Sequence, residues 1–253
     1  MQIIGHRGAK GLAPENTIAG IAFALARKVD WIEFDVRATK DNKVVVIHDA
    51  TLMRISKERG RVRDYTYAEL HRLATWSGEP IPTFEEVMKA IGKKAKVDIE
   101  LKEKGCSAKV IEIINQQVLA GRSYSDFIVS SFKPWLLKEM KSQEPRIPRL
   151  LLQGGVPFLF LLFPGLQLSG VGFSRFAAPR QAISMAKKRG LWTIAFTINS
   201  KAEAALFKAK GIDAIATDVP QAFISAWPIV IRWGLGLVCL AVALLLLCYV
   251  VRL

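Results

Sequence analysis

Short apolar runs alternate with amphipathic stretches along almost the whole chain. Runs rich in β-branched and aromatic residues predict strands at residues 2–5, 31–36, 44–48, 96–101, 127–131, 150–153, 171–173, 192–196 and 214–217. Apolar positions at helical spacing predict helices between most of them, at residues 17–27, 67–73, 84–91, 107–120, 134–142, 179–189 and 201–209. Strands that alternate with helices in this way are typical of a parallel sheet.

The number of strand–helix units selects among the parallel-sheet folds. About eight units over roughly 225 residues fit an α/β fold of the (β/α)8 TIM-barrel type, with an open doubly wound sheet as the alternative. The strand predicted at 44–48 follows its predecessor after a turn too short for a helix, so we expect a hairpin arm there. With the charged, irregular stretch 56–82, it predicts a small insertion after the second strand that covers the site.

Two apolar segments stand apart from this pattern. Residues 233–251 carry no charge, and a helix of that length comes close to crossing a hydrocarbon core of about 30 Å. We therefore expect a barrel domain at 1–225 and one C-terminal transmembrane helix at 226–253, with a buried core helix as the alternative. Residues 150–170 are also uncharged but are broken by Gly and Pro, which predicts either a buried strand and loop or an apolar lip that contacts a membrane or an acyl chain.

Composition and charge narrow the range of partners. The chain has 253 residues, with 36 Lys and Arg against 22 Asp and Glu, a formal charge of +14. This surplus predicts an acidic partner. Because the basic residues are spread along the chain and no nucleic-acid-reading motif is present, we expect an anionic membrane surface or a phosphate substrate, and no nucleic acid. The positive charge before the predicted span, and an N-terminus unlike a signal peptide, predict a cytoplasmic barrel on a single-pass membrane protein. The oligomeric state stays open.

Charged residues gather near the ends of the predicted strands. Glu33 and Asp35 stand two apart in one strand, and Asp98, Glu100 and Lys102 repeat that spacing in another. Members of each set therefore share a face of their strand. They are either surface charges on edge strands or inward groups, which need partners because an unpaired buried carboxylate is costly. In the second case Glu33, Asp35 and Glu100 would supply the oxygen ligands that Ca²⁺ or Mg²⁺ prefers.

Two histidines follow short apolar strands and so stand near the same site. His6 and His48 would form an acid–base pair, since an imidazole titrates near neutral pH and transfers protons in both directions. Arg7 and Lys102 would supply fixed positive charge for a phosphate oxyanion. The residues alone leave open which histidine is the base.

Four stretches resemble one known family. GHRGAKGLAPENT, WIEFDVRATKDNKVVVIHD, VDIELK and GIDAIATDVP are similar to motifs of the glycerophosphodiester phosphodiesterase family, and the resemblance covers residues 2–225. HRG, PENT, ExD, HD and ELK occur in order and at family-like spacings. The resemblance implies a TIM-type barrel with a small insertion and a divalent metal at its C-terminal mouth. It implies metal ligation by Glu33, Asp35 and Glu100.

The resemblance also implies roles for the remaining polar residues. His6 is expected to act as the general base and His48 as the general acid, with Arg7 and Lys102 near the phosphate. Glu15 and Asn16 match the PENT motif and are expected to organise the site. Where the family often has Trp-Thr-Val-Asn, this chain has FTIN, so Phe196 is expected to keep an aromatic platform against the substrate.

The expected reaction is metal-dependent hydrolysis of a glycerophosphodiester to glycerol 3-phosphate and an alcohol, through a cyclic phosphate. A water-soluble diester such as glycerophosphocholine is one substrate class. A lysophospholipid, cleaved to lysophosphatidic acid, is the alternative, which the predicted anchor, the apolar segment and the positive charge favour. A non-catalytic membrane-bound scaffold and another metal-dependent phospholipase on the same barrel, such as a sphingomyelinase D, are further alternatives.

Overall fold

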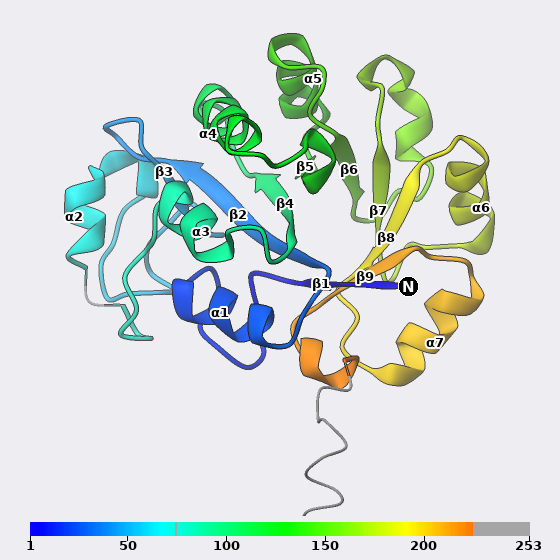
Figure 1. Ribbon diagram of the computed structural model, residues 1–253, viewed down its shortest axis with the longest axis horizontal. Coiled ribbons are helices and arrows are strands. Elements are labelled where there is room, and N and C mark those ends of the chain that lie inside the picture. The colour runs from blue at the N-terminus through cyan, green and yellow to red at the C-terminus, as the bar shows by residue number, and fades with distance from the viewer. Residues whose placement is uncertain (74, 225–253) are drawn as a thin grey trace, which may run out of the picture. The chain divides into compact units, whose positions relative to one another are not determined.

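Parallel strands close into a barrel in the computed structural model, which describes residues 1–73 and 75–224 (Figure 1). Strand β1 pairs with β9 on one side and with β2 on the other, so the sheet has no open end between them. This closure confirms the predicted barrel and excludes the open doubly wound sheet. The eight barrel strands in the described residues are β1 Gln2–Gly5, β2 Trp31–Ala38, β4 Lys96–Leu101, β5 Phe127–Ser131, β6 Arg149–Gln153, β7 Gly170–Ser174, β8 Trp192–Phe196 and β9 Ala214–Thr217.

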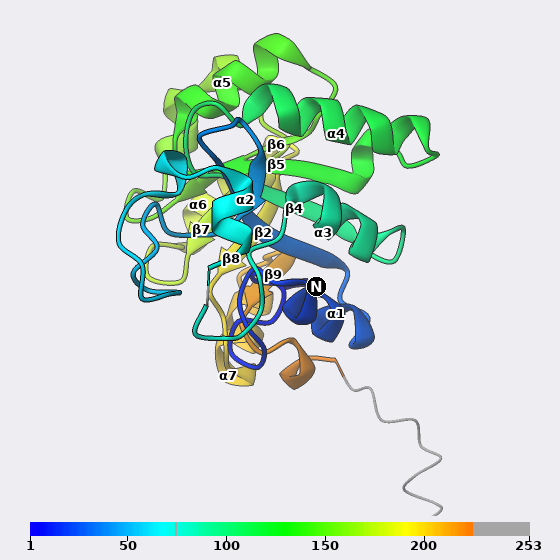
Figure 2. The ribbon, with the colours of Figure 1, turned by 90° about the vertical axis from the view of Figure 1, so that its left-hand side faces the viewer.

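Helices surround the barrel, and their ends follow local sequence signals (Figures 1 and 2). Thr17 caps α1 by accepting a hydrogen bond from the Gly20 amide. Thr83 and Glu86 form a reciprocal capping box at the start of α3. The main helices are α1 Ile18–Ala26, α3 Phe84–Ile91, α4 Ser107–Leu119, α5 Pro134–Gln143, α6 Arg180–Lys188 and α7 Lys201–Ala209.

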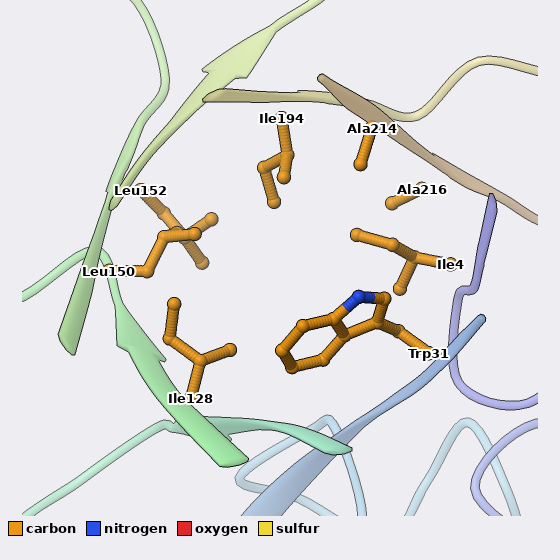
Figure 3. Packing of buried hydrophobic residues seen from close by; sticks show 8 residues of the cluster. All are labelled: Ile4, Trp31, Ile128, Leu150, Leu152, Ile194, Ala214 and Ala216. Carbon is orange, nitrogen blue, oxygen red and sulfur yellow. The ribbon is translucent and has the colours of Figure 1, made fainter. Parts of the chain in front are cut away.

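Apolar side chains fill the barrel interior below the carboxyl ends of the strands (Figure 3). Trp31 is the largest of them and packs on Trp192, with the ring centroids 5.0 Å apart. Burial of this kind contributes about 25 cal/mol for each Å² of apolar surface removed from water. The cluster thus forms a packed floor, and the site must lie above it. Its members are Ile4, Trp31, Ile128, Leu150, Leu152, Ile194, Ala214 and Ala216.

A small insertion follows β2 and has an apolar core of its own. Strand β3, Val44–Val46, pairs antiparallel with the end of β2, as the short preceding turn predicts. A short 3-10 helix, Val62–Asp64, and helix α2, Tyr67–His71, follow it. The buried side chains of this core are Val45, Ile47, Leu52, Val62, Leu70 and Ile81.

The uncharged segment 150–170 contains the buried strand and loop of the first prediction, and the loop has exposed apolar side chains. Strand β6 is buried throughout, and two short 3-10 helices, Leu159–Leu162 and Pro164–Leu166, follow it. Phe160 and Leu166 are buried in this stretch, whereas Val156 and Leu162 are 58% and 70% exposed. The segment is therefore a buried strand followed by a loop that keeps some large apolar side chains on the surface.

The predicted membrane localisation requires correction. Between residues 1 and 224, with residue 74 set aside, no helix combines the length and apolar character that crossing a membrane needs. The anchor expected at 226–253 lies outside the described residues. The single-pass membrane localisation and the cytoplasmic placement derived from it are therefore not retained.

Candidate active site at the carboxyl ends of the strands

Along some strands, such as β2, the inward-facing positions are apolar first and polar two residues later, so a polar layer lies directly above the apolar floor. Trp31 belongs to the floor, and Glu33 and Asp35 stand two and four residues further along β2 on the same face. Likewise Ile194 lies in the floor, and Phe196 ends β8 two residues later. Because parallel strands end at the same side of a barrel, these positions meet at its C-terminal mouth.

Three carboxylates converge where β2 and β4 lie side by side. The strand register pairs Glu33 with Asp98 and Asp35 with Glu100. Ligand atoms of Glu33, Asp35 and Glu100 all lie within 4.8 Å of one another, and all three residues are buried. The surface-charge alternative for these residues is therefore wrong.

Burial and mutual repulsion perturb the acids of this group. Burial, followed by repulsion from Asp35 and Glu100, raises the pKa of Glu33 well above its ordinary value. Burial and then Asp35 raise the pKa of Glu100 to about 7. The pKa of Asp98 also rises to about 7, chiefly because of its burial. The cluster thus holds more negative charge than its surroundings compensate.

Two cations hold the most deeply buried acid of the group. The Lys102 Nζ atom lies 2.9 Å from Asp35 Oδ1 and 2.6 Å from Glu100 Oε1. The Arg7 Nε atom lies 3.2 Å from Asp35 Oδ2. Burial by itself would raise the pKa of Asp35, but Lys102 and Arg7 lower it below its ordinary range. Asp35 is therefore ionised.

The donor set fits a divalent cation bound by oxygen. Glu33 Oε1 is buried and has no hydrogen-bond partner among the described residues, so one carboxylate oxygen is left for a ligand. All three donors are carboxylates, which suit Ca²⁺ and Mg²⁺ better than softer metals. The group could thus bind a metal, as the sequence spacing indicated.

His6 faces an aspartate from the last strand. Its Nδ1 atom lies 2.6 Å from Asp218 Oδ1, and Asp218 follows β9. Asn199 Nδ2 donates to the other carboxylate oxygen of Asp218 at 3.0 Å. Partial burial would raise the pKa of Asp218, but its hydrogen bonds with His6 and Asn199 contribute to lowering it to about 2. Asp218 thus occupies Nδ1 and leaves Nε2, 3.9 Å from Glu33 Oε2, toward the pocket.

His48 has the same arrangement with its neighbour in sequence. Its Nδ1 atom lies 2.6 Å from Asp49 Oδ1. Partial burial would raise the pKa of Asp49, but hydrogen bonds with Arg54 and His48 lower it to about 2. Burial is the largest cause of the lowered pKa of His48. Each histidine therefore has a carboxylate at Nδ1, an arrangement that fixes the ring and its tautomer.

One pocket of about 280 Å³ joins these groups. Seven of the residues predicted from sequence line it. Asp35 does not line it, and Glu15 and Asn16 line a second pocket that also contains His48. Phe196 forms part of the apolar side, with its ring edge-on to Phe132 at a centroid distance of 5.6 Å. The seven are His6, Arg7, Glu33, His48, Glu100, Lys102 and Phe196.

Glu15 and Asn16 form hydrogen bonds with two of the charged residues at the site, Arg7 and Asp35. The Asn16 side chain donates to Asp35 Oδ2 at 2.8 Å, and Glu15 Oε1 accepts from the Arg7 guanidinium at 3.1 Å. Gly8 adopts a φ of +81°, and a Cβ placed there would stand 2.7 Å from the Gly20 carbonyl carbon. Only glycine allows the turn after β1 to pack this closely against α1.

Several residues in or next to the pocket were absent from the sequence prediction. Asp218 lies inside the stretch GIDAIATDVP, whose pattern was noted, but no spacing links it to His6. Arg54 and Asn199 lie outside the pocket lining and give no signal in sequence, because Arg54 reaches Glu15 across 39 positions and Asn199 reaches Asp218 across 19. Further residues lining the pocket are Lys10, Asp98, Ser130, Phe132, Leu152, Ile194, Thr197 and Ala216.

The sequence and the fold both match known proteins. Residues 6–222 match the glycerophosphoryl diester phosphodiesterase family. The Bacillus subtilis protein YhdW is 36% identical over 87% of this chain and 96% of its own length. The glycerophosphodiester phosphodiesterase of Caldanaerobacter subterraneus subsp. tengcongensis is 32% identical over 88% of this chain and 96% of its own.

A solved structure gives the same assignment. A phosphodiesterase of Oleispira antarctica, in complex with the product sn-glycerol-3-phosphate, superposes with a TM-score of 0.80 at 29% identity, covering 87% of this chain and 94% of that chain. A barrel with these carboxylates and histidines at its mouth, together with these matches, defines a phosphodiester hydrolase. The chain belongs to the glycerophosphoryl diester phosphodiesterase family and is an enzyme of that class.

Proposed function

We propose that this enzyme hydrolyses glycerophosphodiesters to sn-glycerol 3-phosphate and an alcohol. The main observation is that two histidines, two cations and two acids of the triad, Glu33 and Glu100, line one pocket of about 280 Å³. A pocket of this size suits a small polar diester, and its two cations suit a phosphate anion. The product complex of the Oleispira antarctica relative supports glycerol 3-phosphate as a product.

Glu33, Asp35 and Glu100 would hold a divalent cation, Ca²⁺ or Mg²⁺, whose bound form supplies Lewis-acid polarisation of oxygen ligands. Arg7 and Lys102 would bind the phosphoryl oxygens and stabilise the charge that develops on them. Their guanidinium and ammonium groups are already oriented by contacts with Asp35. Phe196 and Phe132 would pack against the apolar part of the substrate.

The two histidines would move the protons. In the first step the Nε2 atom of His6 takes a proton from a glycerol hydroxyl, which attacks phosphorus and forms a cyclic phosphate. His48 donates a proton to the oxygen of the leaving alcohol as the bond from phosphorus to that oxygen breaks. In the second step His48 removes a proton from water and the water oxygen attacks phosphorus. The bond from phosphorus to the attacking glycerol oxygen of the first step breaks, and His6 returns a proton to that oxygen. Asp218 and Asp49 support these roles by occupying the Nδ1 atoms.

Lysophospholipid cleavage is a second candidate function. Large apolar side chains are exposed after β5, β6 and β7, where the strands end at the mouth of the barrel. Phe132, Leu162 and Phe176 are exposed by 42%, 70% and 84%, and Phe132 also lines the pocket. An acyl chain on the glycerol would find apolar contacts along such a rim.

Substrate competition separates the two candidates. The purified protein, supplied with Ca²⁺ or Mg²⁺, is expected to have a higher kcat/KM for glycerophosphocholine than for lysophosphatidylcholine. Leu162→Ser is compared with the parent, because it removes exposed apolar surface at a residue that does not line the pocket. A higher kcat/KM for the lysolipid, reduced by Leu162→Ser, would favour the second candidate instead. Absence of turnover for both would refute the proposed function.

A further inference from the structure

Arg54 connects two carboxylates of different segments from its place in the insertion. Its Nε atom donates to Asp49 Oδ2 at 2.5 Å. Its two terminal nitrogens donate to the two oxygens of Glu15 at 2.6 and 3.0 Å. All three nitrogens of the guanidinium are therefore used, and the pair with Glu15 is bidentate, a geometry that arginine forms and lysine does not.

Each of these carboxylates contacts a residue of the proposed catalytic apparatus. Asp49 Oδ1 lies 2.6 Å from His48 Nδ1, and Glu15 Oε1 lies 3.1 Å from the Arg7 guanidinium. Arg54 is thus one contact removed from the proposed general acid and one contact removed from a phosphate-binding cation. It does not line the pocket that these groups share.

We infer that Arg54 is a positioning residue that fixes His48 through Asp49 and Arg7 through Glu15, so that the insertion sets the geometry of the active site. The inference rests on the proposed function for its catalytic consequence. It assigns the insertion a role beyond covering the barrel.

Because Arg54 is partly exposed, its substitution should affect the active site more than the stability of the fold. Its side chain is 45% exposed, whereas Glu15 and Asp49 are exposed by 14% and 24%. Ion pairs of a half-exposed arginine contribute little to stability. Without Arg54, however, Asp49 and Glu15 each lose a charged partner and gain rotational freedom, which loosens the His48 ring and the Arg7 guanidinium.

The test compares Arg54→Met with Arg63→Met. Arg63 belongs to the same insertion, is 64% exposed, and forms one ion pair among the described residues, with Asp64 at 3.9 Å. Arg54→Met is expected to lower kcat for glycerophosphocholine by about tenfold or more, with a smaller change in KM and a Tm close to that of the parent. Arg63→Met is expected to change none of the three. Arg54→Lys, which keeps the charge but not the bidentate contact, is expected to restore part of kcat, and it replaces Arg54→Met should that variant not fold.

A double-mutant cycle tests whether Arg54 acts through Asp49. Because both substitutions loosen the same histidine, Arg54→Met and Asp49→Asn together are expected to lose less kcat than the product of their separate losses. Losses that multiply, or a kcat for Arg54→Met within twofold of the parent, would overturn the inference.

The imidazole signals provide a readout that needs no turnover. The chain has three histidines, so each ring can be assigned in an NMR spectrum by one substitution. Arg54→Met is expected to shift the ring signals of His48 and to leave those of His6 unchanged. An unchanged His48 spectrum would overturn the inference even if the proposed substrate is wrong, whereas absent turnover of the parent protein with a shifted His48 would refute only the proposed function.

Discussion

The Nδ1 atom of His6 and the Oδ1 atom of Asp218 lie 2.6 Å apart, although 212 positions separate them in sequence. Closure of the barrel brings them together, because β1 and β9 are neighbours in the sheet. The contact assigns Nδ1 to the aspartate and leaves Nε2 for chemistry. The general base of the proposed mechanism therefore depends on the last strand as much as on the first.

Asp218→Asn tests this dependence. An amide at that position can donate to Nδ1, which favours the tautomer with its proton on Nε2 and removes the base. We expect kcat to fall by about 100-fold with little change in KM. Asp64→Asn, at an exposed position in the insertion, is the control and should keep full activity. Equal kcat values for Asp218→Asn and the parent would contradict the role given to Asp218.

The leaving group distinguishes the proposed acid from the proposed base. A p-nitrophenol leaving group departs without protonation, whereas choline does not, and general acid catalysis contributes about 10²–10⁴-fold. We expect His48→Gln to lose at least about tenfold more kcat on glycerophosphocholine than on the p-nitrophenyl ester of glycerol 3-phosphate. His6→Gln should impair both esters alike. The reverse pattern would exchange the two roles, and equal losses in both variants would refute the assignment.

Thermal melting tests the metal site without a substrate. If Glu33, Asp35 and Glu100 bind Ca²⁺ or Mg²⁺, saturation with the metal should raise Tm by about 2–8 °C. Glu33→Gln should abolish this shift, and it should also raise the Tm of the metal-free protein because it removes a repelled, buried carboxylate. Glu112→Gln, at an exposed position on α4, should melt like the parent. The same metal-induced shift in both variants would exclude Glu33 as a ligand.

Gly8→Ala tests the turn that carries His6 and Arg7. A methyl group at position 8 would meet the Gly20 backbone at 2.7 Å, whereas Gly190 has a similar φ, +72° against +81°, and no heavy atom within 4 Å. Gly190→Ala should therefore cost about 1 kcal/mol from the backbone conformation alone. Gly8→Ala should cost more and should also lower kcat/KM, as measured by urea unfolding and turnover. Equal effects of the two substitutions would show that close packing at Gly8 is unimportant.

Local periodicity explains what could be predicted from the sequence. Alternation within β2 predicted that Glu33 and Asp35 share one face, and the same spacing predicted this for Glu100 in β4 and Lys102, which follows it. Those expectations depend only on the backbone geometry of a strand, so they do not require knowledge of the tertiary structure. The barrel was predictable for the same reason, since the order of strands and helices leaves few topologies.

Contacts between distant segments explain what could not be predicted. Asp218 and Arg54 act on residues of other segments, and no spacing in the chain reveals such pairs. The mixed character of segment 150–170 also depends on tertiary packing, which buries Phe160 and leaves Leu162 exposed. The roles of His6, His48, Arg7 and Lys102, and the domain division at residue 225, stay predictions.

Product analysis tests the central claim most directly. The purified protein with Ca²⁺ or Mg²⁺ is incubated with glycerophosphocholine, and the products are separated and quantified, with His6→Gln as the inactive control. The account predicts sn-glycerol 3-phosphate and choline in equal amounts from the parent and neither from the variant. Glycerol and phosphocholine as products, or no consumption of the diester, would contradict it.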